Sequence, residues 1–276
     1  MRIQEALRAL AEILANAQID APAREARLLL AHAMDVPHER LVLMAHDDLD
    51  LAIFERAVSY CLRRAAGEPT SMIRGYRDFF GRRFSVTAEV LDPRPETEIL
   101  VAEALTQKFQ TVLDLGTGSG CILISLLAER PQATGIGGDL SEAALKVAEG
   151  NARDLGVANR AEFLHSDWFS GIAGTFDLIV SNPPYISAEE MTELSAEVLN
   201  HDPHMALTPG GDGLRPYRIL AQQAPGYLAP AGRILLEIGW RQGPQVAQIF
   251  LDHGWRDVRV LPDLDGKDRV VTATRG

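Results

Sequence analysis

The first third of the chain carries hydrophobic residues at helical spacing. Apolar positions 3, 7, 10 and 14 fall on one face of a helix and are separated by polar residues. A second amphipathic run is expected to begin at Asp20, a typical N-cap residue, with Pro22 in its first turn. A third run follows Asp50 and ends near Gly67. This pattern predicts a small helical domain over residues 1–68.

A β-hairpin is predicted to follow this helical domain. Residues 70–86, TSMIRGYRDFFGRRFSV, contain two short strand-like runs around a glycine-containing turn. We therefore expect residues 69–90 to form a β-hairpin that links the helical domain to the rest of the chain.

From about residue 95 the pattern changes to strand-like runs that alternate with helix-like runs. The strand-like runs are TVLDL at 111–115, ATGIGG at 133–138, AEFLH at 161–165, FDLIV at 176–180 and RILLEI at 233–238. Near the end, WRDVRVLPD and DRVVTAT predict two further strands, joined as a hairpin at the sheet edge. The alternation predicts an α/β domain over residues 91–276, with a mostly parallel sheet and helices on both faces.

Composition favours a cytoplasmic protein without a metal site or a membrane span. The 276 residues suffice for one large core plus a small satellite domain, and no run approaches about 18 uninterrupted apolar residues. Cys61 and Cys121 form no CxxC pair, which argues against a disulfide framework and a zinc site. His201 and His204 have metal-like spacing but no evident third ligand. We expect no metal.

Charge is distributed unevenly along the chain. Residues 1–84 contain 12 Arg, no Lys and 12 acidic residues, so this part is neutral. Residues 85–276 contain 15 basic and 26 acidic residues, which accounts for the whole net charge of −11. Binding to a phosphate backbone relies on Lys and Arg. The charge therefore favours a basic protein partner or a small ligand over direct contact with nucleic acid.

A glycine-rich loop connects the first predicted strand of the α/β domain to a helix. The loop is DLGTGSG at residues 114–120, and its glycines are Gly116, Gly118 and Gly120. Glycine allows a tight turn and a close approach of the backbone to a ligand. The spacing lacks the last glycine of GxGxxG, because position 121 is Cys, and this disfavours a dinucleotide.

Two further residues at strand ends point to a nucleoside pocket. Asp139 ends the second strand, 23 positions after Gly116, where a carboxylate can accept from both ribose hydroxyls. Trp168 follows the third strand, where its ring can stack on an adenine. Alternatively, the glycines only form a turn, Asp139 caps the next helix and Trp168 belongs to the core. Asp114 can either hold the loop or contact an amino group of the ligand.

The fourth strand runs into NPPY at residues 182–185. The side-chain oxygen of Asn182 and the carbonyl of Pro183 are two acceptors held in a fixed pair, which matches the two donors of an NH₂ group. Such a nitrogen is a poor nucleophile, so positioning and electrostatics would supply the rate. Tyr185 would pack over the planar group. The pattern favours methyl transfer to nitrogen from S-adenosylmethionine (SAM), although NPPY alone is also compatible with a rigid turn.

Taken with the DLGTGSG loop, NPPY resembles the class I SAM-dependent methyltransferases that modify planar nitrogens. These include the adenine-N6 DNA methyltransferases and the protein glutamine N5-methyltransferases. The chain is more similar to the glutamine methyltransferases that modify peptide chain release factors, and the resemblance covers nearly its whole length. It rests also on DPRPETEILVAEAL at 92–105, HDPHMALTPGGDGLRPYRIL at 201–220, LLEIGWRQGPQVAQIF and DLDGKDRVV, and on the helical domain followed by a hairpin.

The resemblance implies a residue-by-residue site. It implies SAM contacts, with S-adenosylhomocysteine as the product, at the following positions: Gly116, Thr117, Gly118, Ser119, Gly120, Asp139, Trp168 and Asn182. It implies that Asn182, Pro183, Pro184 and Tyr185 hold the target glutamine, with Asn182, Pro183 and Tyr185 as the catalytic group.

The resemblance also implies a substrate, the glutamine of the GGQ motif in class I release factors. The helical domain would help to dock the release factor, and we expect a cytoplasmic monomer that acts in translation termination. Two positions depart from the family pattern: the second strand is rich in glycine, and His201 replaces an aromatic or acidic residue. Two alternatives stay open, an adenine-N6 methyltransferase of DNA or RNA and a SAM-binding protein without turnover.

Overall fold

The computed structural model describes residues 1–275, and the chain divides into two compact units. The first consists of Met1–Tyr76 together with Ala196–His201, and the second consists of Arg77–Ser195 together with the chain from Asp202 onward. The chain therefore changes unit three times along its length. Among the described residues, no helix combines the length and the hydrophobicity that a bilayer crossing requires.

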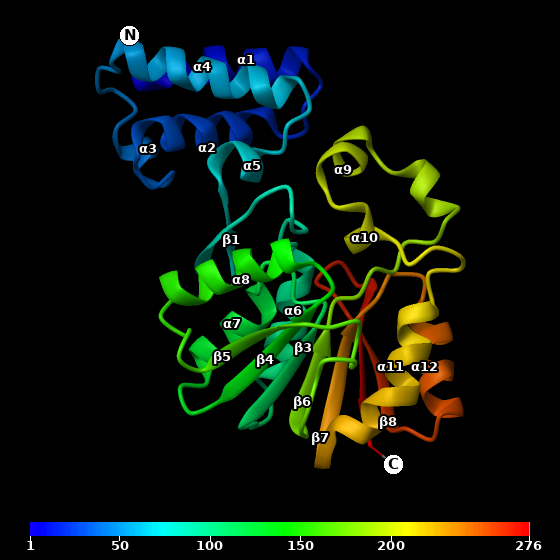
Figure 1. The fold of residues 1–276 in the computed structure, drawn as a ribbon. Helices are drawn as coiled ribbons and strands as arrows, with labels where there is room; N and C mark the ends of the chain where they lie inside the picture. Colours follow the sequence, from blue (N-terminus) through cyan, green and yellow to red (C-terminus); the bar gives the residue numbers. More distant parts are fainter. Residues whose placement is uncertain (276) are drawn as a thin grey trace. The chain divides into compact units, whose positions relative to one another are not determined.

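The first unit is built from helices. They are α1 (Ile3–Asn16), α2 (Pro22–Met34), α3 (Arg40–Leu43), α4 (Leu51–Ala65), α5 (Thr70–Arg74) and, from much later in the chain, α9 (Ala196–His201). The predicted apolar stripe of α1 is buried at Ile3, Leu10 and Leu14, and it packs with α2 and α4 in one core. Figure 1 shows these helices at the blue end of the chain, with α9 in yellow-green.

Two local predictions for this unit are wrong, and one short helix was not predicted. Asp20 does not cap α2, because the N-cap is Ala21 in a left-handed conformation (φ 49°) without a side-chain hydrogen bond. Residues Thr70–Arg74 form a helix where a strand was expected, since Ile73 is buried in the helical core and Gly75 (φ 73°) ends the turn. The short helix α3 was not predicted. Asp50 does cap α4, and its carboxylate accepts from the backbone N–H of Ala52.

The predicted hairpin is present within a shorter range. Strand β1 (Tyr76–Phe79) and strand β2 (Arg82–Ser85) form a two-stranded sheet. Phe80 (φ 47°) and Gly81 (φ 71°) both have positive φ, as a two-residue hairpin turn requires.

The second unit contains a seven-stranded sheet in the order β5-β4-β3-β6-β7-β9-β8. Its strands are β3 (Thr111–Leu115), β4 (Thr134–Asp139), β5 (Ala161–His165), β6 (Phe176–Ser181), β7 (Leu228–Glu237), β8 (Arg256–Pro262) and β9 (Asp268–Thr274). Neighbours from β5 to β7 are parallel, whereas β9 pairs antiparallel with both β7 and β8. The predicted edge hairpin is therefore confirmed.

Helices cover both faces of this sheet. The helices of this unit are α6 (Glu98–Ala104), α7 (Cys121–Glu129), α8 (Glu142–Asp154), α10 (His204–Leu207), α11 (Arg215–Gln223) and α12 (Gly243–Asp252), with 3₁₀ turns η1 (Pro95–Thr97), η2 (Glu190–Glu193) and η3 (Ala224–Tyr227). One core joins the sheet to α6, α7 and α8, and the other joins it to α11 and α12 (Figure 1). Adjacent residues of β3 illustrate this, since Val112 belongs to the first core and Leu113 to the second.

The glycine-rich strand β4 has a packing explanation. A Cβ atom at Gly135 would lie 2.6 Å from Cδ1 of Leu123 and 2.7 Å from Cγ1 of Val112. A Cβ atom at Gly137 would lie 2.9 Å from the Phe163 ring. Helix α7 and strand β5 therefore approach β4 too closely for the larger apolar residues that are usual there.

Candidate active site

A cavity of about 370 Å³ lies in the second unit, and the ends of β3, β4 and β6 contribute to its lining. In open α/β sheets this edge, where the strand order reverses, is where ligands bind. The residues of the predicted site that line the cavity are Gly116, Thr117, Gly118, Ser119, Asp139, Trp168, Asn182 and Pro184. The other three predicted site residues, Gly120, Pro183 and Tyr185, do not belong to the lining.

The glycine loop is fixed to the neighbouring strand. Backbone N–H groups of Gly116 and Thr117 both donate to the carbonyl of Gly138, at 2.8 and 3.1 Å. Gly120 has φ 78° and is the N-cap of α7, where a Cβ atom would lie 2.8 Å from Ile124 Cδ1. A glycine is needed at position 120 both for the positive φ and for the close packing against Ile124. Gly120 therefore fixes the shape of the loop without lining the cavity.

Asp139 joins the loop to the end of β4. Its Oδ2 atom accepts from the N–H of Gly118 at 2.8 Å, and its Oδ1 atom accepts from the N–H of Ser141 at 2.9 Å. The alternative that Asp139 caps the next helix does not hold, because Ser141 is the N-cap of α8 and accepts from the N–H of Ala144. Asp139 is half-buried and lines the cavity, so its carboxylate can also meet a ligand there.

Asp114 is a fully buried carboxyl beside the loop. Its Oδ2 atom accepts from the Thr117 hydroxyl at 2.7 Å, while Oδ1 has no hydrogen-bond partner among the described residues. Burial raises the pKa of Asp114 to about 7, although the bond from Thr117 lowers it. A buried acceptor without a partner is costly unless a ligand supplies a donor. Asp114 is not among the residues that line the cavity, and its bond from Thr117 shows that it holds the loop.

Trp168 belongs to the core and also lines the cavity, which are the two positions that the sequence analysis left open. The residue has a left-handed backbone (φ 53°), which is strained for a bulky side chain. Its carbonyl accepts from the Ser166 hydroxyl at 2.6 Å, which helps to hold this conformation. The half-buried ring packs against the core under α11 and also lines the cavity.

The NPPY segment is held by contacts on both sides. The Nδ2 atom of Asn182 donates to the Thr97 hydroxyl at 3.3 Å, which leaves the amide oxygen available as an acceptor. Further along, the Gln242 amide donates to the carbonyl of Tyr185 at 2.9 Å and accepts from the N–H of Gly239 at 3.0 Å. Pro183 itself is buried, whereas the flanking residues of the motif are half-buried.

Glu237 was missed by the sequence reasoning. It ends β7 with 1% of its surface exposed, and its Oε2 atom has no hydrogen-bond partner within residues 1–275. Burial raises the pKa of Glu237 to about 7, while the Thr97 hydroxyl, Arg269 and the Tyr185 hydroxyl act in the opposite direction. The sequence signal that could have indicated Glu237 as a site residue is an acidic residue near the end of the apolar run RILLEI.

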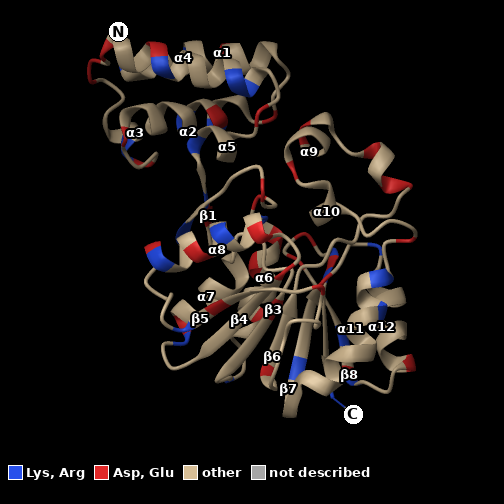
Figure 2. Ribbon diagram, in the orientation of Figure 1, with Lys and Arg blue, Asp and Glu red and all other residues tan. Residues whose placement is uncertain are grey.

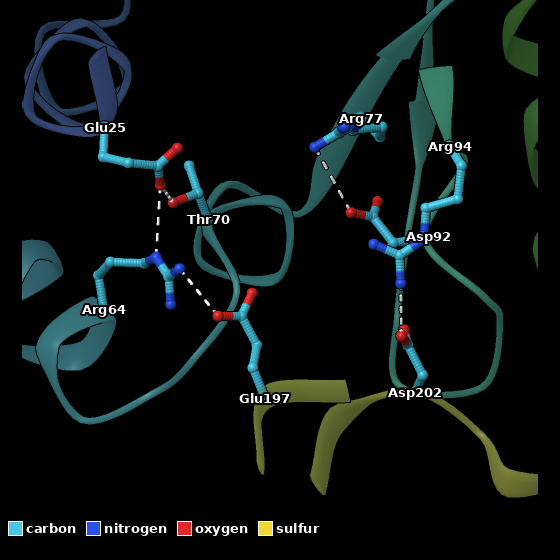
Figure 3. Close-up of polar contacts among 8 residues, drawn as sticks. All are labelled: Glu25, Arg64, Thr70, Arg77, Asp92, Arg94, Glu197 and Asp202. Atoms are coloured by element: carbon cyan, nitrogen blue, oxygen red, sulfur yellow. Dashed lines mark hydrogen bonds and ion pairs between the residues drawn. The ribbon is translucent and has the colours of Figure 1, made fainter. Parts of the chain in front are cut away.

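Ion pairs fix the segment that precedes η1. Arg94 pairs with Asp202 at 2.6 Å, and Arg77 pairs with Asp92 at 3.6 Å (Figure 3). Both Asp92 and Arg94 line the cavity. No group of three or more potential metal ligands occurs in the described part of the chain, His201 and His204 included.

Comparisons with known proteins give a consistent result. The family model "Methyltransferase small domain" matches residues 88–236, and "PrmC N-terminal domain" matches residues 5–75. The chain is 55% identical to the release factor glutamine methyltransferase of Cereibacter sphaeroides, over 99% of this chain and 98% of that protein. It is 44% identical to the protein of the same name from Rhodospirillum rubrum, over 94% of this chain and 81% of that one.

A solved structure supports the fold independently. The methyltransferase from Pyrococcus furiosus matches with a TM-score of 0.55 and 15% identity, over 72% of this chain and 91% of that one. At this identity the likeness concerns the fold alone. Together with the sheet order, it confirms the predicted class I methyltransferase fold.

Proposed function

Because the chain belongs to the release factor glutamine methyltransferase family, we propose that it methylates the side-chain amide nitrogen, N5, of a glutamine. The methyl donor is SAM, and the glutamine is that of the GGQ motif in class I peptide chain release factors. The near-complete alignment with the relative from Cereibacter sphaeroides carries this proposal.

The residues that line the cavity suit the binding of SAM. Asp139 can accept from ribose hydroxyls, the Trp168 ring can stack on the adenine, and the loop from Gly116 to Gly120 lets the ligand approach the backbone. The unpaired Oδ1 atom of Asp114 can accept from the ammonium group of the methionine part. These roles remain part of the proposal.

The chemistry assigned to NPPY follows from its acceptors. When bound, SAM supplies an electrophilic methyl group on its sulfonium. The Asn182 oxygen and the Pro183 carbonyl each accept a hydrogen bond from one N–H group of the target amide. These two hydrogen bonds direct the nitrogen lone pair toward the methyl group. The Tyr185 ring packs over the amide plane. In the transfer, the new N–C bond would replace the S–CH₃ bond, S-adenosylhomocysteine would leave as a neutral thioether with the electron pair, and the nitrogen would release one proton to water.

The same proposal covers the partner and the cellular setting. The helical unit, residues 1–68 in the sequence-based division, is the region that we expect to dock the release factor. Acidic residues are frequent in the sequence from η2 to α9, where Figure 2 shows several red positions, and this acidic segment suits a basic protein. We propose a cytoplasmic monomer that needs no metal and makes no direct contact with nucleic acid.

A methyl-transfer assay with two classes of substrate tests the proposed function. Labelled SAM is supplied with purified class I release factors or with duplex DNA, and mass spectrometry locates the modified residue. A release factor with GGQ changed to GGA is the matched control. We expect label on the GGQ glutamine and on neither the control nor the DNA. Label on adenine would instead favour the adenine-N6 alternative, and absence of label on the release factor would contradict the proposal.

A further inference from the structure

The Gln242 side chain lies where three separate segments of the second unit meet. Its Nε2 atom donates to the carbonyl of Tyr185 at 2.9 Å, and its Oε1 atom accepts from the N–H of Gly239 at 3.0 Å. A Cβ atom at Gly213 would overlap the Tyr185 carbonyl and would lie 3.1 Å from Nε2 of Gln242. The amide therefore fills a space bounded by the main chain at residues 185, 213 and 239.

Gln242 is itself held firmly at the start of α12. It is the N-cap of that helix, its N–H donates to the carbonyl of Gly239 at 2.8 Å, and its carbonyl accepts from the N–H of Val246 at 2.9 Å. Only 9% of the residue is exposed. Because the backbone and the side chain are both fixed, the amide can in turn fix the position of the Tyr185 carbonyl.

The two hydrogen-bond partners determine which way the Gln242 amide faces. The N–H of Gly239 can only donate, and the carbonyl of Tyr185 can only accept. A flipped amide would place its NH₂ against a donor and its oxygen against an acceptor, so both hydrogen bonds would be lost. Position 242 therefore needs one donor and one acceptor side by side. An ionised glutamate lacks the donor, and a methionine lacks it as well.

The NPPY segment cannot hold its shape through its own donors. Pro183 and Pro184 have no N–H, and their rings fix φ near about −65°. The direction of the Pro183 carbonyl then depends on the few torsions that remain between the two ends of the segment. At one end, Ser181 is the fully buried last residue of β6, and at the other end Gln242 holds the Tyr185 carbonyl.

We propose that Gln242 is a positioning residue for methyl transfer. Its amide holds the Tyr185 carbonyl, and this keeps the Pro183 carbonyl and the Tyr185 ring in the orientation that the target amide requires. The inference rests on the proposed function, in which these two groups contact the target glutamine. It adds to the site a residue from the start of α12 that is not among those lining the cavity.

Gln242→Glu provides a test that a purely structural role would not pass. When ionised, the new carboxylate cannot donate to the Tyr185 carbonyl. When protonated, it has one O–H that can donate to this carbonyl and a second oxygen that can accept from the N–H of Gly239. Burial favours the neutral form of a carboxyl. Low pH should therefore restore the contact in Gln242→Glu, whereas Gln242→Met has no group that acidification could restore.

Other titratable groups surround the Gln242 amide, and the wild-type protein and the variants share them. They are Tyr185, Tyr217, Glu237, Asp268 and Arg269. Because their titration affects every protein in the series, kcat is compared as the ratio of variant to wild type at each pH. Saturation with SAM removes the effect of pH on SAM binding.

Methyl transfer to a class I release factor is measured at saturating SAM between about pH 6 and about pH 9. At the alkaline end, we expect Gln242→Glu and Gln242→Met to lower kcat roughly 10- to 100-fold, while the Kd for SAM stays within about threefold. Toward the acidic end, the ratio for Gln242→Glu should rise at least about fivefold, and the ratio for Gln242→Met should stay constant. Gln245→Glu, at an exposed position in the first turn of the same helix, is the control and should match wild type.

A matched pair of glycines displaces the amide without replacing it. A Cβ atom at Gly239 would lie 2.9 Å from Oε1 of Gln242, whereas a Cβ atom at Gly226 meets open space, and neither glycine has a positive φ. We expect Gly239→Ala to lower kcat and Gly226→Ala to leave it close to wild type. This pair decides the question if circular dichroism shows that a substitution at position 242 prevents folding.

A second readout does not depend on turnover. Tyr185–Ile186 is the only Tyr–Ile pair in the sequence, so protein labelled with ¹³C-carbonyl tyrosine and ¹⁵N-isoleucine gives one carbonyl–amide NMR signal, from this peptide bond. We expect the signal to move when Gln242→Glu ionises, to return on acidification, and to stay displaced at every pH in Gln242→Met. If it does so but the wild-type protein does not methylate the GGQ glutamine, the proposed function fails and the contact between Gln242 and Tyr185 stands.

Three results would overturn the inference itself. The first is a wild-type kcat in Gln242→Met, the second is a kcat ratio for Gln242→Glu that does not depend on pH, and the third is a Tyr185 carbonyl signal that is identical in all the variants. A loss of SAM affinity that accounts for the whole loss of rate would also contradict it, because the role assigned to Gln242 concerns the target amide.

Discussion

The guanidinium of Arg64 donates to the carboxylate of Glu197 at 2.8 Å, across 133 positions of the sequence (Figure 3). Arg64 lies on α4, and Glu197 lies on the short helix α9, within the same helical unit. The guanidinium also pairs with Glu25 at 3.4 Å, and only 9% of Arg64 is exposed. One buried cation therefore holds two acidic side chains from distant parts of the chain.

Removal of this cation should loosen α9. We expect Arg64→Met to destabilise the helical unit by roughly 1–3 kcal/mol, because two carboxylates lose their partner in a partly desolvated place. Hydrogen exchange at residues 196–201 should become faster. Arg218→Met, which breaks the exposed pair with Asp212, is the control and should change stability by less than about 0.5 kcal/mol. Unchanged exchange at 196–201 would show that α9 is held by other contacts.

Asn182→Ala should separate turnover from SAM binding. The substitution removes one of the two acceptors proposed for the target amide, so methyl transfer should fall roughly 100- to 1,000-fold. SAM affinity, measured by calorimetry, should change less than about tenfold, because the glycine loop and Asp139 are intact. Asn159→Ala, at an exposed position, is the control. Turnover within threefold of wild type would contradict the role assigned to Asn182.

Asp114→Asn should stabilise the protein without SAM and weaken the binding of SAM. The pKa of Asp114 is raised in the folded protein, so the unfolded chain releases this proton at lower pH and stability falls as pH rises from about 4 to about 7. Without SAM, we expect the variant to be more stable than wild type by roughly 1–3 kcal/mol at pH 8 and nearly equal to it at pH 4.

SAM binding should respond in the opposite direction. At pH 8 the Asp114→Asn variant should bind SAM at least about tenfold more weakly, since the ionised acceptor for the ammonium group is lost. Urea denaturation and calorimetry at several pH values measure both effects, with the exposed Asp154→Asn as control. A stability gain that is the same at every pH would rule out ionisation as its cause.

Two glycines of the GGDG segment provide a matched pair of substitutions. Gly211 (φ 60°) and Gly213 (φ 75°) are both left-handed, so alanine should cost each about 1 kcal/mol of stability. A Cβ atom at Gly211 meets open space, whereas a Cβ atom at Gly213 overlaps the carbonyl of Tyr185. We therefore expect Gly213→Ala to reduce turnover strongly and Gly211→Ala to leave it close to wild type. Equal turnover in the two variants would show that this contact does not position NPPY.

Much of the fold was predictable because its signals are local. The alternation of strands and helices and the edge hairpin each depend on a few neighbouring residues, and both predictions are confirmed. The family resemblance, carried by motifs from residue 92 to the last strands, is confirmed by the relatives. Strand β7 begins at Leu228, five positions before the predicted start, in a stretch where proline and glycine hide the pattern.

The parts that could not be predicted depend on distant contacts. Thr70–Arg74 is helical because Ile73 packs into the helical core, and local sequence favoured a strand there. Nothing near Glu197 indicates that it meets Arg64. The hydrogen bond from the Asn182 amide to the Thr97 hydroxyl joins residues that lie 85 positions apart. Roles for individual site residues remain predictions, although eight of the eleven line one cavity.

The inclusion of α9 in the helical unit has a consequence for how this architecture can be recombined. The chain enters the second unit after Tyr76, returns for the six residues Ala196–His201, and leaves again at Asp202. In a chimera that exchanges only residues 1–76 between relatives, α9 would have to pack against a helical unit from a different protein. We therefore expect a functional chimera to require that residues 196–201 are exchanged together with residues 1–76. The two stretches act as one structural unit, although 119 residues separate them in the sequence.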